Sequence, residues 1–148
     1  MAQTVSFVNL DLDPSADAHA SPHERASCGR TTVLVVDDHP GYRRALESLL
    51  RGSAELVLVG SACNGEEAVR LAAELRPHVI VMDLAMAGLN GVEATLRIRA
   101  QLRPPTVVAL SGSRELMRDA VAAGAAFTML KDEDPQRLLE VIQAASGV

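Results

Sequence analysis

The stretch "VLVVDDHPGYR", residues 33–43, carries four apolar residues straight into two adjacent aspartates, Asp37 and Asp38. A short, continuous and largely β-branched run is typical of a parallel strand that is buried on both faces. Pro40 suits the first turn of a helix, so the stretch predicts a strand followed at once by a helix. Taken alone, the two aspartates are more typical of a solvated helix start than of a ligand site.

The same alternation continues to the end of the chain. Asn64 with Glu67 three residues later, and Asn90 with Glu93, are typical of capped helix starts, and Gly124 is typical of a helix end. The apolar runs are residues 32–36, 56–62, 78–83, 106–110 and 126–130. Strict alternation of strands and helices predicts an α/β fold, a doubly wound five-stranded parallel sheet flanked by five helices.

Composition restricts the class of protein. The chain has 148 residues and a net charge of −5, which argues against a broad nucleic-acid footprint because that needs a basic face. No apolar run approaches the roughly 20 residues of a membrane span, and the N-terminus does not resemble a signal peptide. Cys28 and Cys63 have no metal or disulfide spacing, which favours free thiols in a reducing cytoplasm.

The first thirty residues differ from the rest of the chain. Residues 11–30, "DLDPSADAHASPHERASCGR", are small, polar and rich in Pro, Ser and Asp, so they have little apolar surface to bury. We therefore expect a flexible N-terminal extension over residues 1–30 and one folded domain over residues 31–148.

Polar side chains follow four of the five apolar runs. Asp37 and Asp38 follow the first run, Asp83 ends the third, Ser111 follows the fourth and Lys131 follows the fifth. In such sheets ligands bind beyond the carboxyl ends of the strands. Carboxylates gathered there repel one another by about 4 kcal/mol per pair at 4 Å, unless a hard cation such as Mg²⁺ neutralises them. The combination predicts a phosphoryl-transfer site with Asp83 as the nucleophile.

Residues 31 to about 146 resemble the receiver domain of bacterial two-component response regulators. The resemblance rests on "VVDDHP", "MDLAMAGLNG", "ALSGS" and "MLKD". The opening "DDHPGYRRAL" is similar to receivers of regulators that usually carry a C-terminal helix-turn-helix DNA-binding domain. The resemblance implies a flavodoxin-like receiver fold, and a histidine kinase or phosphotransfer protein as partner.

By this resemblance, Asp83 accepts a phosphoryl group from the kinase. Ser111 contacts that group and moves on activation, while Lys131 pairs first with Asp83 and then with the phosphate. Gly112 matches the family's small residue where a backbone N–H meets the phosphoryl oxygens. The resemblance implies that Mg²⁺ is held by Asp37, Asp38, Asp83 and the backbone carbonyl of Ala85.

Three departures from the family pattern are visible. Ala87 stands where the family usually has proline, so the loop loses a restraint on its backbone. Thr128 occupies the switch position, where the family usually has Tyr or Phe. Phe127 lies one residue earlier, and a shift of one residue on a strand points its side chain to the opposite face. The segment 111–124 is about two residues shorter than we expect for the family.

We therefore predict a stand-alone receiver, because the sequence ends at Val148 just after the last predicted helix. It would act in the bacterial cytoplasm through contacts with a downstream protein or a second copy of itself, with no direct nucleic-acid or membrane partner. Its chemistry would be self-directed, so we do not expect an enzyme.

Two other classes of protein are alternatives to the predicted stand-alone receiver. An interaction module that has the receiver fold and signals without phosphorylation is favoured by Thr128 and by the short segment 111–124. A phosphatase or phosphotransferase with an aspartyl nucleophile would usually place a second acid two residues after that nucleophile. That position is Ala85 here, which argues against such an enzyme.

Overall fold

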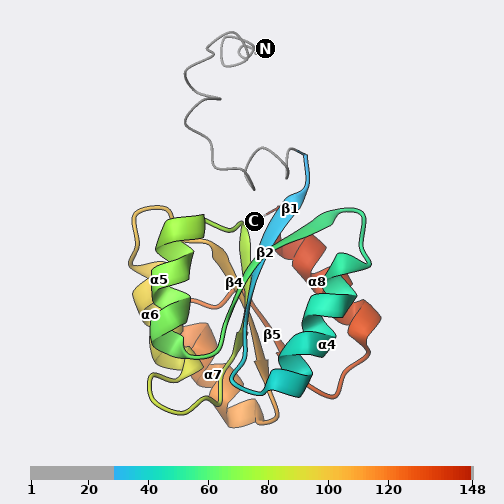
Figure 1. Cartoon of the computed structure of the whole chain (residues 1–148). Helices are drawn as coiled ribbons and strands as arrows, with labels where there is room; N and C mark the ends of the chain where they lie inside the picture. The colour runs from blue at the N-terminus through green and yellow to red at the C-terminus, as the bar shows by residue number, and fades with distance from the viewer. Residues whose placement is uncertain (1–28, 148) are drawn as a thin grey trace, which may run out of the picture.

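Five parallel strands form a single sheet in the order β2-β1-β3-β4-β5 (Figure 1). The structure is a computed structural model, and it describes residues 29–147. The strands are β1 (Thr31–Val36), β2 (Leu56–Ala62), β3 (Val79–Asp83), β4 (Thr106–Ser111) and β5 (Phe127–Leu130). The helices are α4 (Pro40–Arg51), α5 (Gly65–Leu75), α6 (Gly91–Arg99), α7 (Arg114–Ala123) and α8 (Pro135–Ala145). The predicted α/β fold is confirmed.

The helices cover both faces of the sheet, with α5, α6 and α7 on one side and α4 and α8 on the other (Figure 1). Successive residues of each strand point to opposite faces. In β1, Leu34 and Val36 therefore pack under α5 and α6, whereas Val33 and Val35 pack under α4 and α8. All four side chains are fully buried. This two-sided burial explains why the strands read as nearly continuous apolar runs.

Side chains at the helix starts fix where the chain turns back from the sheet. Asn64 and Asn90 each accept a hydrogen bond from the backbone N–H three residues on, as their spacing predicts, and Asp134 accepts one from Gln136. Each such cap contributes about 1 kcal/mol. Gly124 ends α7 with φ +111°, a left-handed conformation that favours glycine.

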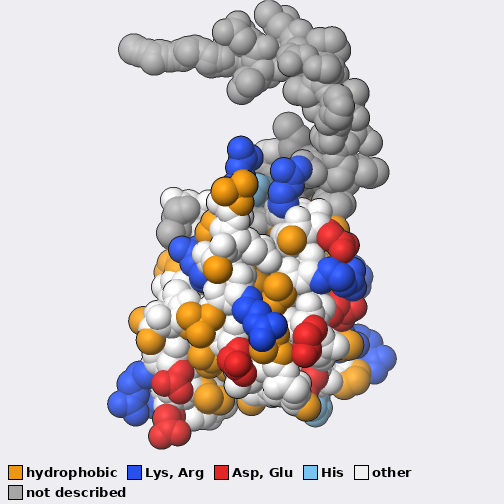
Figure 2. Space-filling model, turned by 90° about the vertical axis from the view of Figure 1, so that its left-hand side faces the viewer, with side chains coloured by type: hydrophobic (Ala, Val, Ile, Leu, Met, Phe, Trp, Pro, Cys, Tyr) orange, Lys and Arg blue, Asp and Glu red, His pale blue; other side chains and the backbone are white. Residues whose placement is uncertain are grey.

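Nearly all of the predicted N-terminal extension, together with Cys28, lies outside the described residues, so its flexibility stays a prediction. Within residues 29–147, Cys63 is an exposed free thiol. None of the helices in that range is both long and apolar enough to cross a membrane. On the face that α5 and α6 cover, acidic and basic side chains are interspersed (Figure 2).

The carboxyl ends of the strands lie at the lower edge of the sheet in Figure 1, where β1 passes into α4. β1 pairs with β3, β3 with β4, and β4 with β5. The four strands whose ends carry the predicted polar residues are therefore neighbours, and their ends meet at one place.

Candidate functional site

Three carboxylates meet at this edge. Asp37 follows β1 and is fully buried, Asp83 ends β3 and is 3% exposed, and Asp38 is exposed beside them. One carboxylate oxygen from each lies within 4.8 Å of the other two. The strand register places these oxygens together, because β1 and β3 are hydrogen-bonded neighbours.

Lys131 reaches into the same group from the end of β5. Its Nζ lies 2.9 Å from Asp37 Oδ2 and 3.4 Å from Asp83 Oδ1. The side chain is 25% exposed, so this ion pair is screened less than a pair on the open surface. One ammonium therefore stands against two buried carboxylates, which leaves the site with an excess of negative charge.

Burial and charge shift the protonation of both partners. Burial raises the pKa of the Asp83 carboxyl, and repulsion from Asp37 raises it further. Lys131 and the Ala85 N–H act in the opposite direction on that pKa. For Lys131, burial by itself lowers the pKa, but the hydrogen bond to Asp37 and the attraction of both carboxylates outweigh it and the pKa is raised.

Backbone donors hold the carboxylates in place. The N–H of His39 donates to Asp37 Oδ1 at 2.8 Å, and the N–H of Ala85 donates to Asp83 Oδ1 at 3.2 Å. The N–H of Ala87 donates to Asp38 Oδ2 at 3.3 Å. The loop after β3 thus reaches back to the loop after β1, with alanine at the position where the family usually has proline.

Ser111 completes the arrangement from the end of β4. It is fully buried, and its Oγ accepts a hydrogen bond of 2.9 Å from the N–H of Ser113. The N–H of Lys131 donates to its carbonyl at 2.9 Å, which ties β4 to the end of β5. Gly112 beside it is exposed, and a Cβ built there would meet no heavy atom within 4 Å. The fold itself therefore does not require glycine at this position.

The switch position and its neighbour point to opposite faces of β5. Thr128 lines a cavity of about 370 Å³ together with side chains of α7, whereas Phe127 packs into the core under α4 and α8. Phe127 therefore does not substitute for the missing aromatic side chain, in agreement with the one-residue shift read from the sequence.

The donor set suits Mg²⁺. The three side chains Asp37, Asp38 and Asp83 offer only carboxylate oxygens, which are hard ligands, and no His or Cys belongs to this group within the described residues. Ala85 lies in the loop that follows β3, and the role of its carbonyl as a fourth ligand stays a prediction.

Two contacts at the site were not anticipated from the sequence. Tyr42 on α4 places its ring 4.4 Å from Lys131 Nζ, measured to the ring centroid. Arg43 donates from Nη1 to the backbone carbonyl of Asp37 at 2.8 Å. Both contacts could have been anticipated from the sequence. Tyr42 and Arg43 lie in the first turn of α4, and this turn faces the site because the helix begins just after the two aspartates.

Comparison with known proteins settles the family. The model of the response regulator receiver domain matches residues 33–143. This chain belongs to the response regulator receiver domain family. Receivers of two-component systems accept a phosphoryl group on an aspartate, bind Mg²⁺ at an acidic pocket, and interact with histidine kinases or phosphotransfer proteins.

Two curated relatives are bacterial response regulators. The transcriptional regulatory protein LiaR of Bacillus subtilis is 37% identical over 116 residues, which are 77% of this chain and 55% of LiaR. The nitrate/nitrite response regulator NarL of Escherichia coli is 37% identical over 78% of this chain and 55% of its own. The receiver thus spans about half the length of these curated relatives.

A solved structure supports the same fold. The response regulator domain of Thermotoga maritima CheB superposes with a TM-score of 0.75 at 32% identity, covering 80% of this chain and 98% of that domain.

Proposed function

We propose that Asp83 is the phosphoacceptor of this receiver, and that the phosphorylated form acts through protein–protein contacts. An oxygen of the Asp83 carboxylate would attack the phosphorus of a phosphohistidine, the P–N bond would break, and an acyl phosphate would form. The observation that carries the proposal is the position of Lys131 Nζ, 3.4 Å from Asp83 Oδ1, beside three carboxylates whose oxygens lie within 4.8 Å of one another.

The neighbouring residues have distinct roles in this proposal. Lys131 would offer its ammonium to an oxygen of the incoming phosphoryl group, and Ser111 would offer its hydroxyl. The backbone N–H of Gly112 would donate to a third oxygen. Asp37, Asp38, Asp83 and the Ala85 carbonyl would hold Mg²⁺. When bound, Mg²⁺ neutralises the negative charge that carboxylates and phosphoryl oxygens bring together.

The experiment that tests this is intact mass spectrometry after incubation with a small-molecule phosphodonor and Mg²⁺. We expect a gain of one phosphoryl group, lost in Asp83→Asn and in the presence of EDTA. Asp119→Asn, an exposed carboxylate on α7, is the matched control and should gain the group as the wild type does. A phosphoryl group on Asp83→Asn would contradict the assignment of the acceptor.

A second candidate function is an interaction module that uses the receiver fold without phosphorylation. It is favoured by Thr128, which leaves the side of β5 toward α7 without an aromatic side chain. Absence of phosphorylation even with a cognate histidine kinase would support this second function. Action without an attached effector domain, in the cytoplasm and without nucleic acid or membrane, stays a prediction.

A further inference from the structure

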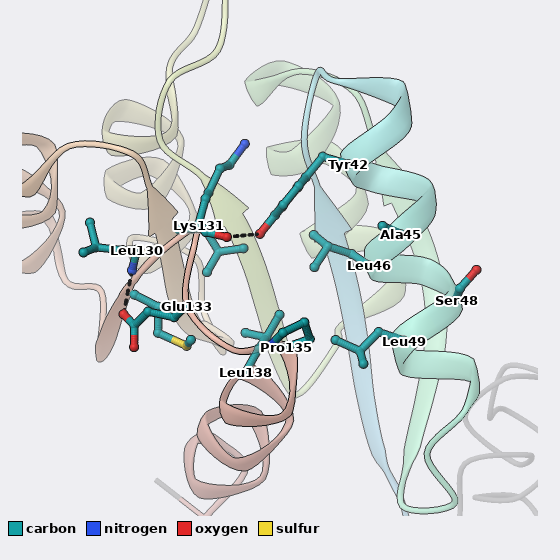
Figure 3. A pocket seen from close by; sticks show the side chains of 12 residues that line it. Tyr42, Ala45, Leu46, Ser48, Leu49, Leu130, Lys131, Glu133, Pro135 and Leu138 are labelled. Carbon is teal, nitrogen blue, oxygen red and sulfur yellow. Dashed lines mark hydrogen bonds between the residues drawn. The ribbon is translucent and has the colours of Figure 1, made fainter.

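Tyr42 is an aromatic side chain in direct contact with the charged group of this site. It lies in the first turn of α4, is half-buried, and faces Lys131 across the gap between α4 and the end of β5 (Figure 3). Lys131 Nζ lies over the ring, 4.4 Å from its centroid, and the Tyr42 hydroxyl donates to the Lys131 carbonyl at 3.4 Å.

These contacts enclose the ammonium of Lys131. Asp37 and Asp83 attract it, and the ring of Tyr42 adds the negative face of an aromatic quadrupole. A lysine side chain has four rotatable bonds, so without such contacts its ammonium occupies many positions. The hydroxyl contact is long for an O–H donor, which leaves the ring as the principal contribution of Tyr42.

The ring also connects the site to a cavity. Tyr42 and Lys131 form one end of a cavity of about 450 Å³ between α4 and α8, whose walls are mostly apolar side chains such as Leu49 and Leu138 (Figure 3). A movement of Lys131 toward a phosphoryl group would therefore change the environment of a ring that lines this cavity.

We propose that Tyr42 is a positioning residue, which holds the Lys131 ammonium where it meets the phosphoryl group on Asp83. This inference rests on the proposed function of Asp83. It assigns to α4 an aromatic contact with the site, in a receiver whose β5 carries Thr128 at the switch position.

The first test compares the rates at which variants gain the phosphoryl group, by mass. Tyr42→Leu keeps an apolar side chain in the cavity but removes the ring, and we expect its rate to fall about two- to tenfold. Tyr42→Phe keeps the ring, so it should retain most of the wild-type rate. Leu49→Ala, about two turns further along α4 in the same cavity, controls for loss of packing. Equal rates for wild type and Tyr42→Leu would overturn the inference.

A double-mutant cycle separates positioning from general packing. In a Lys131→Gln background the ring has no ammonium to hold, so Tyr42→Leu should reduce the already low rate little further. A second loss as large as that seen in the wild-type background would show that the ring acts by another route, and would overturn the inference.

Fluorescence offers a direct view of the ring. The chain has one tyrosine and no tryptophan, so its tyrosine emission comes from Tyr42 alone. We expect this emission to change during phosphorylation with the same time course as the gain in mass. Full phosphorylation with unchanged emission would overturn the inference and leave the proposed function intact. If the wild type gains no phosphoryl group, even from a histidine kinase, the proposed function of Asp83 and the inference about Tyr42 are both wrong.

Discussion

At the scale of single residues, the fold holds two carboxylates close together in a buried site, where their negative charges repel each other. Asp37 and Asp83 are both buried, and Lys131 is the ammonium that contacts both. Burial and repulsion raise the pKa of Asp83, so its ionised form costs folding free energy. Such a cost at a strand end indicates that a ligand, and not stability, explains the arrangement.

Replacement of Asp83 should therefore stabilise the protein when Mg²⁺ is absent. The raised pKa means that the folded state binds a proton more tightly than the unfolded chain, so stability is lost as pH rises through the folded pKa. Asp83→Asn has no ionisable carboxyl at this position, so the variant does not lose this stability. At neutral pH in EDTA we expect its denaturant midpoint to exceed that of the wild type.

The difference in denaturant midpoint between Asp83→Asn and the wild type should shrink as the pH is lowered toward the ordinary carboxyl pKa of about 3.9. Asp119→Asn is the control, and as an exposed substitution it should change the free energy of unfolding by less than about 0.5 kcal/mol. A midpoint for Asp83→Asn below that of the wild type at neutral pH would show that the pairing with Lys131 outweighs burial and repulsion.

At the scale of elements, two helices begin in close contact with the loops of the site. Gly91 is the first residue of α6, and a Cβ there would lie 2.2 Å from the carbonyl oxygen of Asp83. Gly65 is the first residue of α5, and a Cβ there would lie 2.2 Å from the carbonyl oxygen of Leu89. Both contacts are with backbone, which cannot rotate away as a side chain can. Gly91 therefore sets how closely α6 approaches the end of β3, and Gly65 sets how closely α5 approaches the loop that follows β3.

Gly91→Ala should displace the end of β3 and with it Asp83. Overpacking of this kind typically costs about 1–3 kcal/mol, and contact with backbone places this substitution at the upper end. We expect a lower free energy of unfolding and a slower gain of the phosphoryl group.

Gly41→Ala is the matched comparison, because it lies in the first turn of α4, where a Cβ would meet no heavy atom within 4 Å. It should leave stability unchanged or raise it by up to about 1 kcal/mol. Urea unfolding of both variants checks the contrast. Equal free energies of unfolding for Gly91→Ala and Gly41→Ala would mean that the loop after β3 moves to accommodate the added Cβ without loss of stability.

At the scale of the whole molecule, one sheet joins two separate cores. One core lies under α5, α6 and α7 and the other under α4 and α8, and both are built on the same strands. The site takes a residue from the end of each of four strands. It therefore exists only when the whole sheet is formed, and ligand binding should be coupled to unfolding of the entire domain.

Mg²⁺ should accordingly stabilise the complete domain. At a concentration one hundred times its dissociation constant, a ligand that binds only the folded state adds about 2.7 kcal/mol to the free energy of unfolding. We expect a rise in the thermal midpoint with Mg²⁺ that is much smaller in Asp38→Asn, which removes one of the three clustered carboxylates.

A monovalent salt at equal ionic strength controls for screening. The same rise in that salt, or an undiminished rise in Asp38→Asn, would argue against a specific metal site at these residues.

The order of elements and the residues at the strand ends could be predicted from the amino-acid sequence alone. Parallel strands buried on both faces must read as apolar runs, and helix caps need particular residues at particular spacings. The α/β fold followed from these local rules and was confirmed. The candidate site residues could be named from the sequence because strand ends in such a sheet share an edge, and their roles stay predictions. They are Asp37, Asp38, Asp83, Ser111 and Lys131.

Contacts between side chains of different elements could not be predicted in this way and depend on how the elements pack. The contact of Tyr42 with Lys131 joins residues 89 positions apart, through the packing of α4 beside the end of β5. The close approach of Gly91 to Asp83 depends likewise on how α6 is seated against the sheet. The periodicity of apolar residues in a segment shows which face of that helix or strand is buried. It does not show which other element packs against that face, so contacts of this kind require the tertiary structure.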